Sequence, residues 1–295
     1  MSNRLTTTVI ATPDPPPVGI PNPIHADDGA AAAGYQGALV AGVRTYGWVA
    51  DAVRALVGRR WLAEGWADVT LRRPLFSGET LQIDIDPDPD DAAPNANAHA
   101  RRWSVRAGVG TDRVVLEGEV GVGSAPWLGD IEPPLFAPAA DPPPMRPTYT
   151  LDTVPYGTAL RPLGAFITEE AARRLATGDL GLTHSDLPDG VVHPWFLAAR
   201  MAPLTRHNFT YGPTIHVRTQ IQHRCEVAAG QQLIIGARIV SAHERNEHWY
   251  QILDGMVSTG EGIEVARLRH TTIFRPRGTV TPPPIVGDPP TASSH

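Results

Sequence analysis

The chain has 295 residues, 42% of them hydrophobic, and a formal net charge of −6 at pH 7. This length and apolar content are typical of one large or two ordinary domains with a substantial core. The acidic balance, without an extended basic stripe, argues against a nucleic-acid partner. The sequence contains no lysine, so every permanently cationic side chain is an arginine.

The N-terminal residues bear on where the protein works. Residues 1–12 lack the basic stretch and following apolar stretch of a signal peptide. No apolar run approaches the roughly 20 residues that a membrane-spanning helix needs. We therefore expect a soluble, cytoplasmic protein without a membrane partner.

The first half begins with a proline-rich segment over residues 13–23, which is expected to be irregular. From Ala26 onward, apolar residues recur near helical spacing. They predict a long, mostly buried helix that is broken or loosened near its glycines and ends near Gly58. Alternating segments then predict four strands, over residues 66–73, 81–85, 103–109 and 114–122.

A second half follows a segment that is dense in proline, residues 126–147, which predicts a linker. Beyond it, helical pieces are expected over residues 168–176 and 192–204. Strands are expected over residues 215–225, 233–240, 248–257 and 265–274. Cys225 is the single cysteine, which excludes an intramolecular disulfide, and we expect it to be a small buried residue inside a strand.

A helix followed by four antiparallel strands thus occurs twice, which indicates an internal duplication. The simplest α+β arrangement wraps each sheet around its own helix and joins the two sheets edge to edge, because joining them hides an open strand edge. We expect domains over residues 1–125 and 148–277, the linker between them, and a disordered tail over residues 278–295.

Two short motifs carry residues that can move protons. Gly178-Asp179 precedes His184 in a predicted loop, and Asn22-Pro23-Ile24-His25 resembles a partial copy of that motif. A carboxylate and an imidazole fixed on one loop can transfer a proton and orient a water, so the motif suggests addition or removal of water. The structural alternative is that Asp179 caps a turn and His184 is an ordinary loop histidine.

Other histidines fall on predicted strands or turns, without the spacing of a metal site. They are His216, His223, His243, His248 and His270. We therefore expect no bound metal.

The motifs resemble those of the hot-dog fold, and within it the MaoC-like dehydratases and R-specific enoyl-CoA hydratases. Their hallmark is Gly-Asp-x-Asn-Pro-(Leu/Ile)-His, followed by a glycine-containing segment. The first half keeps Asn22 to His25 and a similar segment from Gly34 to Val43, but has Ile20 at the aspartate position. The second half keeps Gly178-Asp179 and His184, and has Pro194 at a glycine position.

The resemblance implies a double hot-dog fold and a hydro-lyase that acts on an enoyl or 3-hydroxyacyl thioester of coenzyme A or an acyl carrier protein. Asp179 and His184 would be the acid–base pair and His25 a second catalytic candidate, with Asp27 or Asp28 as its carboxylate if the loop folds back. Backbone donors are expected at Gly42 and Trp195. Substrate contacts are expected at His193, Arg72, Arg73 and Arg200. No cofactor is implied.

Three alternatives stay open. The altered motifs also fit a biosynthetic cyclase or tailoring enzyme that adds an internal nucleophile across the activated double bond. They fit a catalytically silent, acyl-binding partner subunit as well. Thioesterase chemistry is a smaller alternative, because hot-dog folds also host it. One duplicated chain is equivalent to a hot-dog dimer, and we expect a further homodimer or higher homo-oligomer.

Overall fold

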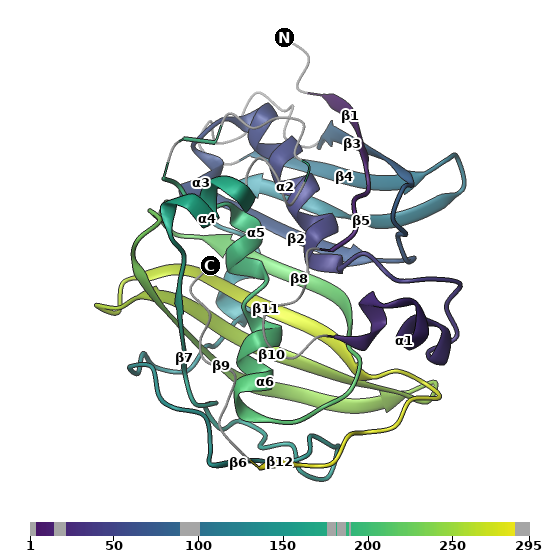
Figure 1. The fold of residues 1–295 in the computed structure, drawn as a ribbon. Helices are drawn as coiled ribbons and strands as arrows, with labels where there is room; N and C mark the ends of the chain where they lie inside the picture. The colour runs from purple at the N-terminus through teal and green to yellow at the C-terminus, as the bar shows by residue number, and fades with distance from the viewer. Residues whose placement is uncertain are drawn as a thin grey trace.

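A computed structural model describes residues 4–14, 22–88, 101–175, 181, 187–188 and 190–286 of the chain (Figure 1). The first half contains β1 (Leu5–Ile10), η1 (Pro23–His25), α1 (Asp27–Ala32), α2 (Gly42–Val57), α3 (Trp61–Glu64), β2 (Gly65–Leu71), β3 (Thr80–Pro87), β4 (Arg101–Val109) and β5 (Arg113–Val122).

The second half repeats this order in outline. It contains η3 (Leu128–Asp130), β6 (Met145–Arg146), β7 (Leu163–Phe166), α4 (Glu169–Arg174), α5 (Pro194–Ala198), α6 (Met201–Asn208), β8 (Ile215–His223), β9 (Gln232–Arg245), β10 (His248–Thr259), β11 (Glu264–Arg275) and β12 (Ile285–Val286). Strands β8 to β11 are each longer than their counterparts β2 to β5.

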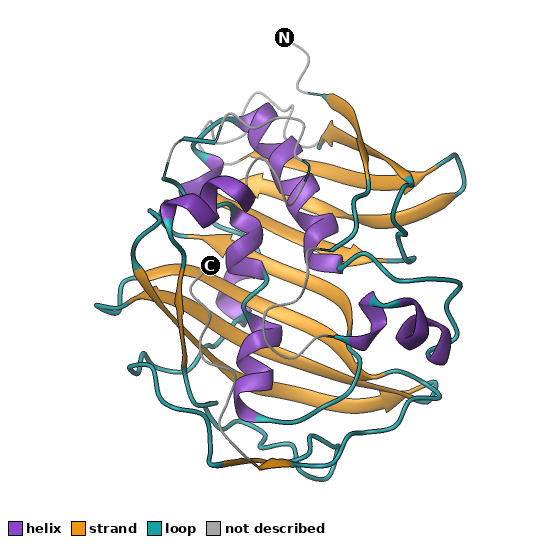
Figure 2. Ribbon diagram, viewed as in Figure 1, coloured by secondary structure: helices purple, strands orange, loops and turns teal. Residues whose placement is uncertain are grey.

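One antiparallel sheet of ten strands spans both halves in the order β1-β3-β4-β5-β2-β8-β11-β10-β9-β7. Helices α2, α5 and α6 run across the same face of this sheet (Figure 2). The expected edge-to-edge junction is confirmed, because β2 pairs with β8 from Trp66 opposite Gln222 to Thr70 opposite Arg218.

Charged and amide side chains reinforce the junction. The Arg218 guanidinium donates to both carboxylate oxygens of Asp68, at 2.7 and 2.6 Å, and Gln220 Nε2 donates to the same carboxylate at 3.0 Å. Two parallel N–H···O bonds fix the orientation of the pair as well as its distance. The two halves are therefore held in register by side chains as well as by the backbone ladder.

Helix α2 forms the centre of the first half, and every residue from Arg44 to Arg54 is buried. It packs beside α5, where a Cβ added to Gly47 would lie 3.2 Å from the Trp195 side chain. The helix predicted from Ala26 is broken near its glycines, as expected. It is split into α1 and α2, and Gly34 has a φ of 84° between them, which glycine adopts without strain.

Three further boundaries differ from the expected ones. The helical piece over residues 192–204 is divided into α5 and α6, with a turn at residues 199–200. Strands β1 and β7 were not anticipated, and they form the two outer edges of the sheet. Cys225 lies beyond the end of β8 and is partly exposed, so the prediction of a buried strand residue is wrong.

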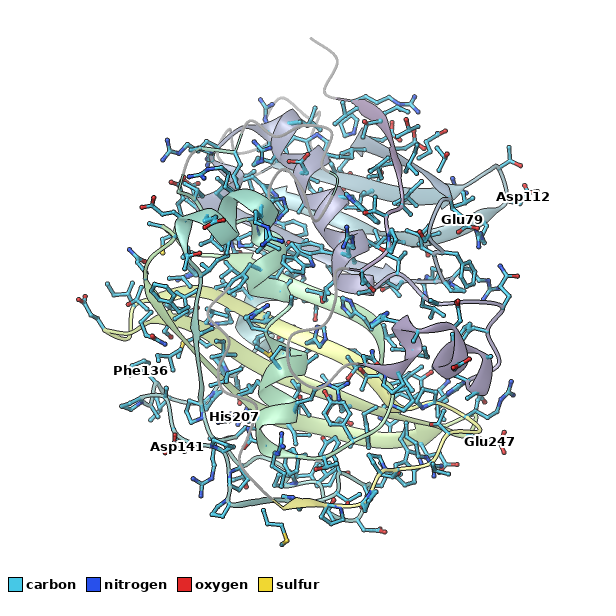
Figure 3. The ribbon with its side chains drawn as sticks, in the orientation of Figure 1. Glu79, Asp112, Phe136, Asp141, His207 and Glu247 are labelled. Atoms are coloured by element: carbon cyan, nitrogen blue, oxygen red, sulfur yellow. The ribbon has the colours of Figure 1, made fainter. Side chains whose placement is uncertain are left out.

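The proline-rich segment runs along the outside of the second half and contacts it repeatedly. His207, at the end of α6, lies 2.9 Å through Nε2 from the Ala140 carbonyl oxygen, and Figure 3 labels His207 near Asp141. Strand β12, in the segment expected as a tail, pairs with β6. No helix in the described ranges is long and apolar enough to cross a membrane.

Candidate functional site

A cavity of about 420 Å³ lies where the N-terminus of α2 meets the ends of β2, β8, β10 and β11. Both halves of the chain line it. Its polar lining residues include Asn22, His25, Arg72, Arg73, His216, His248, Tyr250 and His270. Of the predicted site residues, the structure brings His25, Gly42, Arg72 and Arg73 together here.

The short helix η1 places two side chains of the Asn-Pro-Ile-His motif against each other. Asn22 precedes its first turn, and Asn22 Nδ2 lies 3.1 Å from His25 Nε2. Asn22 also exchanges two hydrogen bonds with the backbone of Thr214, donating to its carbonyl at 2.9 Å and accepting from its N–H at 3.1 Å. The motif is thereby anchored to the chain that leads into β8.

The other ring nitrogen of His25 faces two oxygens. His25 Nδ1 lies 2.7 Å from the Leu39 carbonyl and 3.1 Å from Asp14 Oδ2. Two acceptors at Nδ1 favour the tautomer with the proton on that nitrogen, since the nitrogen that donates is set by its partners. Nε2 then carries the lone pair, and the Asn22 Nδ2–H is placed to donate to it.

Asp14 supplies the carboxylate that the first half lacks at position 20. Its Oδ2 accepts the Ala41 N–H at 2.9 Å, and Arg44 Nη1 lies 4.0 Å from its Oδ1. Burial raises the pKa of Asp14, and His25, Arg44 and the Ala41 amide oppose that rise. Sequence reasoning missed Asp14 because it lies upstream of the motif, inside the proline-rich segment that was expected to be irregular.

The substitutes proposed for that carboxylate are not at His25. Asp27 Oδ1 instead accepts the Ala38 N–H at 2.9 Å, which closes the loop after α1. No hydrogen bond or ion pair joins Asp28 to His25 within the described ranges. The loop does fold back, but it carries Asp27 to the backbone and not to the imidazole.

Gly42 opens α2 and lies in a confined position. A Cβ added there would come within 2.7 Å of Leu71 Cδ2 and 2.8 Å of His216 Cβ, so only glycine fits without movement. In the described part of the chain, the Gly42 N–H has no hydrogen-bond acceptor, as is usual for the first N–H groups of a helix. This amide can donate to a carbonyl oxygen of a bound molecule.

A second polar group in the cavity comes from β8 and β11. The rings of His216 and His270 stack with centres 4.5 Å apart, and Thr219 Oγ1 lies 2.6 Å from His216 Nε2 and 3.1 Å from His270 Nδ1. Burial lowers the pKa of His216 to about 4, and burial together with His216 lowers the pKa of His270. Both rings are neutral at pH 7.

A β-bulge makes this arrangement possible. His216 pairs with Thr272 and Arg218 pairs with Thr271, so Val217 is the extra residue in β8. Strict alternation would place residues 216 and 219 on opposite faces of the sheet, and the bulge brings both to the cavity side. The alternation pattern of the sequence therefore could not predict that His216 and Thr219 lie on the same face.

The arginines predicted to contact substrate have different surroundings. Arg72 Nε donates to Glu117 at 2.8 Å, whereas Arg73 has no carboxylate partner within the described residues. Arg200 is not at the cavity. Its Nε donates to the Phe196 carbonyl at 3.0 Å and its guanidinium carbon lies 3.9 Å from the centre of the Phe196 ring.

Two predicted residues of the second half form a helix cap. His193 precedes α5, is buried, and accepts the Trp195 N–H through Nδ1 at 3.1 Å. Burial lowers the pKa of His193 to about 3, with smaller contributions from Arg54 and His223. The Trp195 amide therefore has an acceptor within the protein. Asp179 and His184 lie outside the described residues.

The residues that the structure describes include no group of three side chains able to hold a metal ion.

No family model matches the sequence, and no curated protein matches it. Several solved structures, however, are similar to this chain. A putative MaoC domain protein dehydratase from Chloroflexus aurantiacus J-10-fl has a TM-score of 0.63 and 12% identity, covering 94% of this chain and 96% of its own.

A conserved hypothetical protein from Mycobacterium tuberculosis, described as having a double hot-dog fold, has a TM-score of 0.57 and 15% identity over 87% of each chain. This chain is a double hot-dog. A putative thioesterase from Novosphingobium aromaticivorans DSM 12444 is also similar, with a TM-score of 0.50 and 14% identity over 92% of this chain and 95% of its own. The double hot-dog fold is therefore shared with proteins of both descriptions.

Proposed function

We propose that this double hot-dog protein is a hydratase or dehydratase that acts on an enoyl or 3-hydroxyacyl thioester, with His25 as an acid–base residue. The supporting observation is that Asp14 and Asn22 hold the two ring nitrogens of His25 at the wall of a cavity that also contains the Gly42 amide. An oriented imidazole and a carbonyl-binding amide are the two parts that such a reaction needs.

The proposed chemistry follows from these positions. In the hydration direction, a water that takes the place of the Asn22 N–H at His25 Nε2 gives that nitrogen a proton. The resulting hydroxyl adds to Cβ of the enoyl group, and the protonated imidazole delivers the proton to Cα. In the dehydration direction the same bonds break and form in reverse. The Gly42 N–H donates to the thioester carbonyl, which carries negative charge while Cα is protonated or deprotonated.

The second half is a further candidate site. There we propose Asp179 and His184 as an acid–base pair, on the strength of their motif alone. The two halves are separable by mutation, because His25 and His184 belong to different halves of the duplication. Hydration of crotonyl-CoA by His25→Ala, Asp179→Asn and His184→Ala variants is the direct comparison. An inactive His25→Ala variant beside an active His184→Ala variant assigns the first half.

The thioester carrier would be coenzyme A or an acyl carrier protein. Arg73 supports this proposal, since an exposed guanidinium at the cavity without a carboxylate partner in the described ranges suits a phosphate. Arg72 suits it less, because Glu117 already neutralises it. A cytoplasmic location and a homo-oligomer stay predictions.

Competing activities give different products from the same substrate. A thioesterase would attack the carbonyl carbon and release free CoA thiol, whereas a hydratase would consume the enoyl group and keep the thioester. A cyclase would spare crotonyl-CoA, which has no internal nucleophile. A silent partner subunit would bind the thioester unchanged. Rapid hydration of crotonyl-CoA without thiol release supports the proposal, and thiol release alone contradicts it.

A further inference from the structure

The cavity contains a histidine pair that acid–base chemistry at His25 does not use. His216 and His270 stack, and the Thr219 hydroxyl lies between a nitrogen of each ring, at 2.6 Å and 3.1 Å. Both histidines line the cavity. Two neutral imidazoles joined by one hydroxyl form a directed hydrogen-bond chain, because a hydroxyl has a single proton to donate.

His270 reaches the cavity through Nε2. Its side chain is 2% exposed, and Nε2 has no hydrogen-bond partner in the described part of the chain, yet it is not sealed from the cavity. Nδ1 of His216, in contrast, is fully enclosed. Of the free ring nitrogens in this pair, only His270 Nε2 is open to a bound molecule.

The enclosed end of this hydrogen-bond chain, at His216, sets the direction of its hydrogen bonds. Burial dominates and keeps the His216 ring neutral, whereas backbone groups of Arg218 and Gly42 act in the opposite sense and favour an N–H on the side of the ring that faces them. Nδ1 makes no hydrogen bond in the described part of the chain and is the ring nitrogen nearest Gly42, where an added Cβ would lie 2.9 Å away. With the proton on Nδ1, His216 Nε2 accepts from Thr219, and Thr219 accepts from His270 Nδ1. His270 Nε2 then carries a lone pair that faces the cavity.

We propose that His270 binds the hydroxyl group of a 3-hydroxyacyl thioester, or the water that adds to the enoyl thioester, by accepting its hydrogen bond at Nε2. This inference rests on the proposed function and adds a specificity residue to the same cavity. Thr219 and His216 are positioning residues, because they hold His270 in the accepting tautomer. The site thereby distinguishes a hydroxylated acyl chain from a saturated one.

The test compares two probes that differ by one hydroxyl, 3-hydroxybutyryl-CoA (each enantiomer) and butyryl-CoA. Binding is measured by calorimetry in a His25→Ala background, so that the hydroxylated probe is not consumed. We expect one enantiomer to bind about tenfold more tightly than butyryl-CoA, the size of one hydrogen bond. His270→Phe keeps a ring for stacking and should remove this preference while leaving butyryl-CoA affinity within about twofold.

Two further variants test the assigned chemistry. Thr219→Val keeps the side-chain shape but removes the hydroxyl that holds His270 in one tautomer. It should lower the preference for the hydroxylated probe severalfold. This variant keeps the test available if His270→Phe does not fold. His270→Gln offers a carbonyl oxygen and should restore part of the preference. His243→Phe is the matched control, since His243 is exposed on β9 and does not line the cavity, and phenylalanine keeps a ring against Tyr250, on which His243 stacks.

The outcomes separate the two proposals. If both probes bind and the preference persists in His270→Phe and Thr219→Val, or is absent from the parent, the role of His270 is overturned and the proposed function stands. If neither probe binds and crotonyl-CoA is not hydrated, the proposed function fails and this inference fails with it.

Discussion

Asp14 Oδ2 lies 3.1 Å from Nδ1 of His25, although the motif that contains His25 has no carboxylate of its own. The same oxygen accepts the Ala41 N–H, so Asp14 joins the imidazole to the start of α2. The acid–base arrangement in the first half is therefore assembled from two separate segments. Its activity should depend on a residue outside the motif.

Asp14→Asn should lower kcat for crotonyl-CoA hydration by about tenfold to a hundredfold. The amide keeps an oxygen for the Ala41 N–H but lacks the negative charge that orients and stabilises a protonated His25. Steady-state kinetics measures the effect. The control is Asp27→Asn, whose carboxylate accepts the Ala38 N–H and makes no other hydrogen bond within the described ranges, so it should leave kcat within about twofold. Equal rates for Asp14→Asn and the parent would remove Asp14 from the mechanism.

Gly42→Ala should destabilise the protein by roughly 1–3 kcal/mol, the usual cost of an overpacked methyl group. The new Cβ would overlap Leu71 and His216, so it should also weaken butyryl-CoA binding. Urea unfolding and calorimetry measure the two effects. Gly129→Ala is the matched control, because no atom lies within 4 Å of a Cβ added there. A Gly42→Ala variant as stable as Gly129→Ala contradicts the crowding argument.

Arg269→Met should cost about 3 kcal/mol of unfolding free energy. Arg269 donates to both oxygens of Asp254, at 2.6 and 2.8 Å, and the Asp254 side chain is only 1% exposed, so the substitution leaves a buried carboxylate without its cation. Arg59→Met should lower the unfolding free energy much less than Arg269→Met, because solvent screens Arg59, which is 67% exposed in its pair with Glu226. Urea unfolding measures the loss of unfolding free energy in each variant. Similar losses would show that burial of the Asp254 carboxylate does not strengthen its ion pair.

Stability should fall as the pH drops from about 6.5 toward 4. Burial lowers the pKa values of His193, His216 and His223 to about 3, 4 and 4 in the folded protein, from 6.5. In this range the unfolded chain binds more protons than the folded one, so the unfolding free energy rises with pH and is lost on acidification. Each such histidine contributes a slope of up to about 1.4 kcal/mol per pH unit.

His223→Phe tests this linkage, because it keeps an aromatic ring against Trp61 and removes one titrating group. Unfolding free energies measured at several pH values between 4 and 7 should show a shallower slope than in the parent. An unaltered slope in His223→Phe would show that other groups control the acid sensitivity.

Periodicity in the sequence predicted most of the architecture. Strands β8 to β11 and the helix α2 follow clear alternating or helical patterns, and the duplication indicated that the two sheets join edge to edge, which they do through β2 and β8. The edge strands β1 and β7 escaped notice. Each of them pairs on one side only, so neither needs the strong alternation of a central strand.

The candidate site was less accessible to sequence reasoning. Motif spacing identified His25 and Gly42, which line the cavity. Asp14 could not be found in this way, because its approach to His25 depends on how the intervening chain folds. His270 was set aside as a strand residue, since the bulge at Val217 that completes its hydrogen-bond chain has no counterpart in a pattern of alternation.

The pairing of β2 with β8 has a consequence for how such a protein can change over evolution. In a symmetric pair of identical single-domain chains, every substitution appears twice and both pockets must tolerate it. Here the equivalent contact is internal, so a substitution is made once and the halves cannot part on dilution. Each pocket can therefore specialise while the other half supports the fold. Independent substitution of this kind accounts for the different motif residues of the two halves, Ile20 in the first and Pro194 in the second.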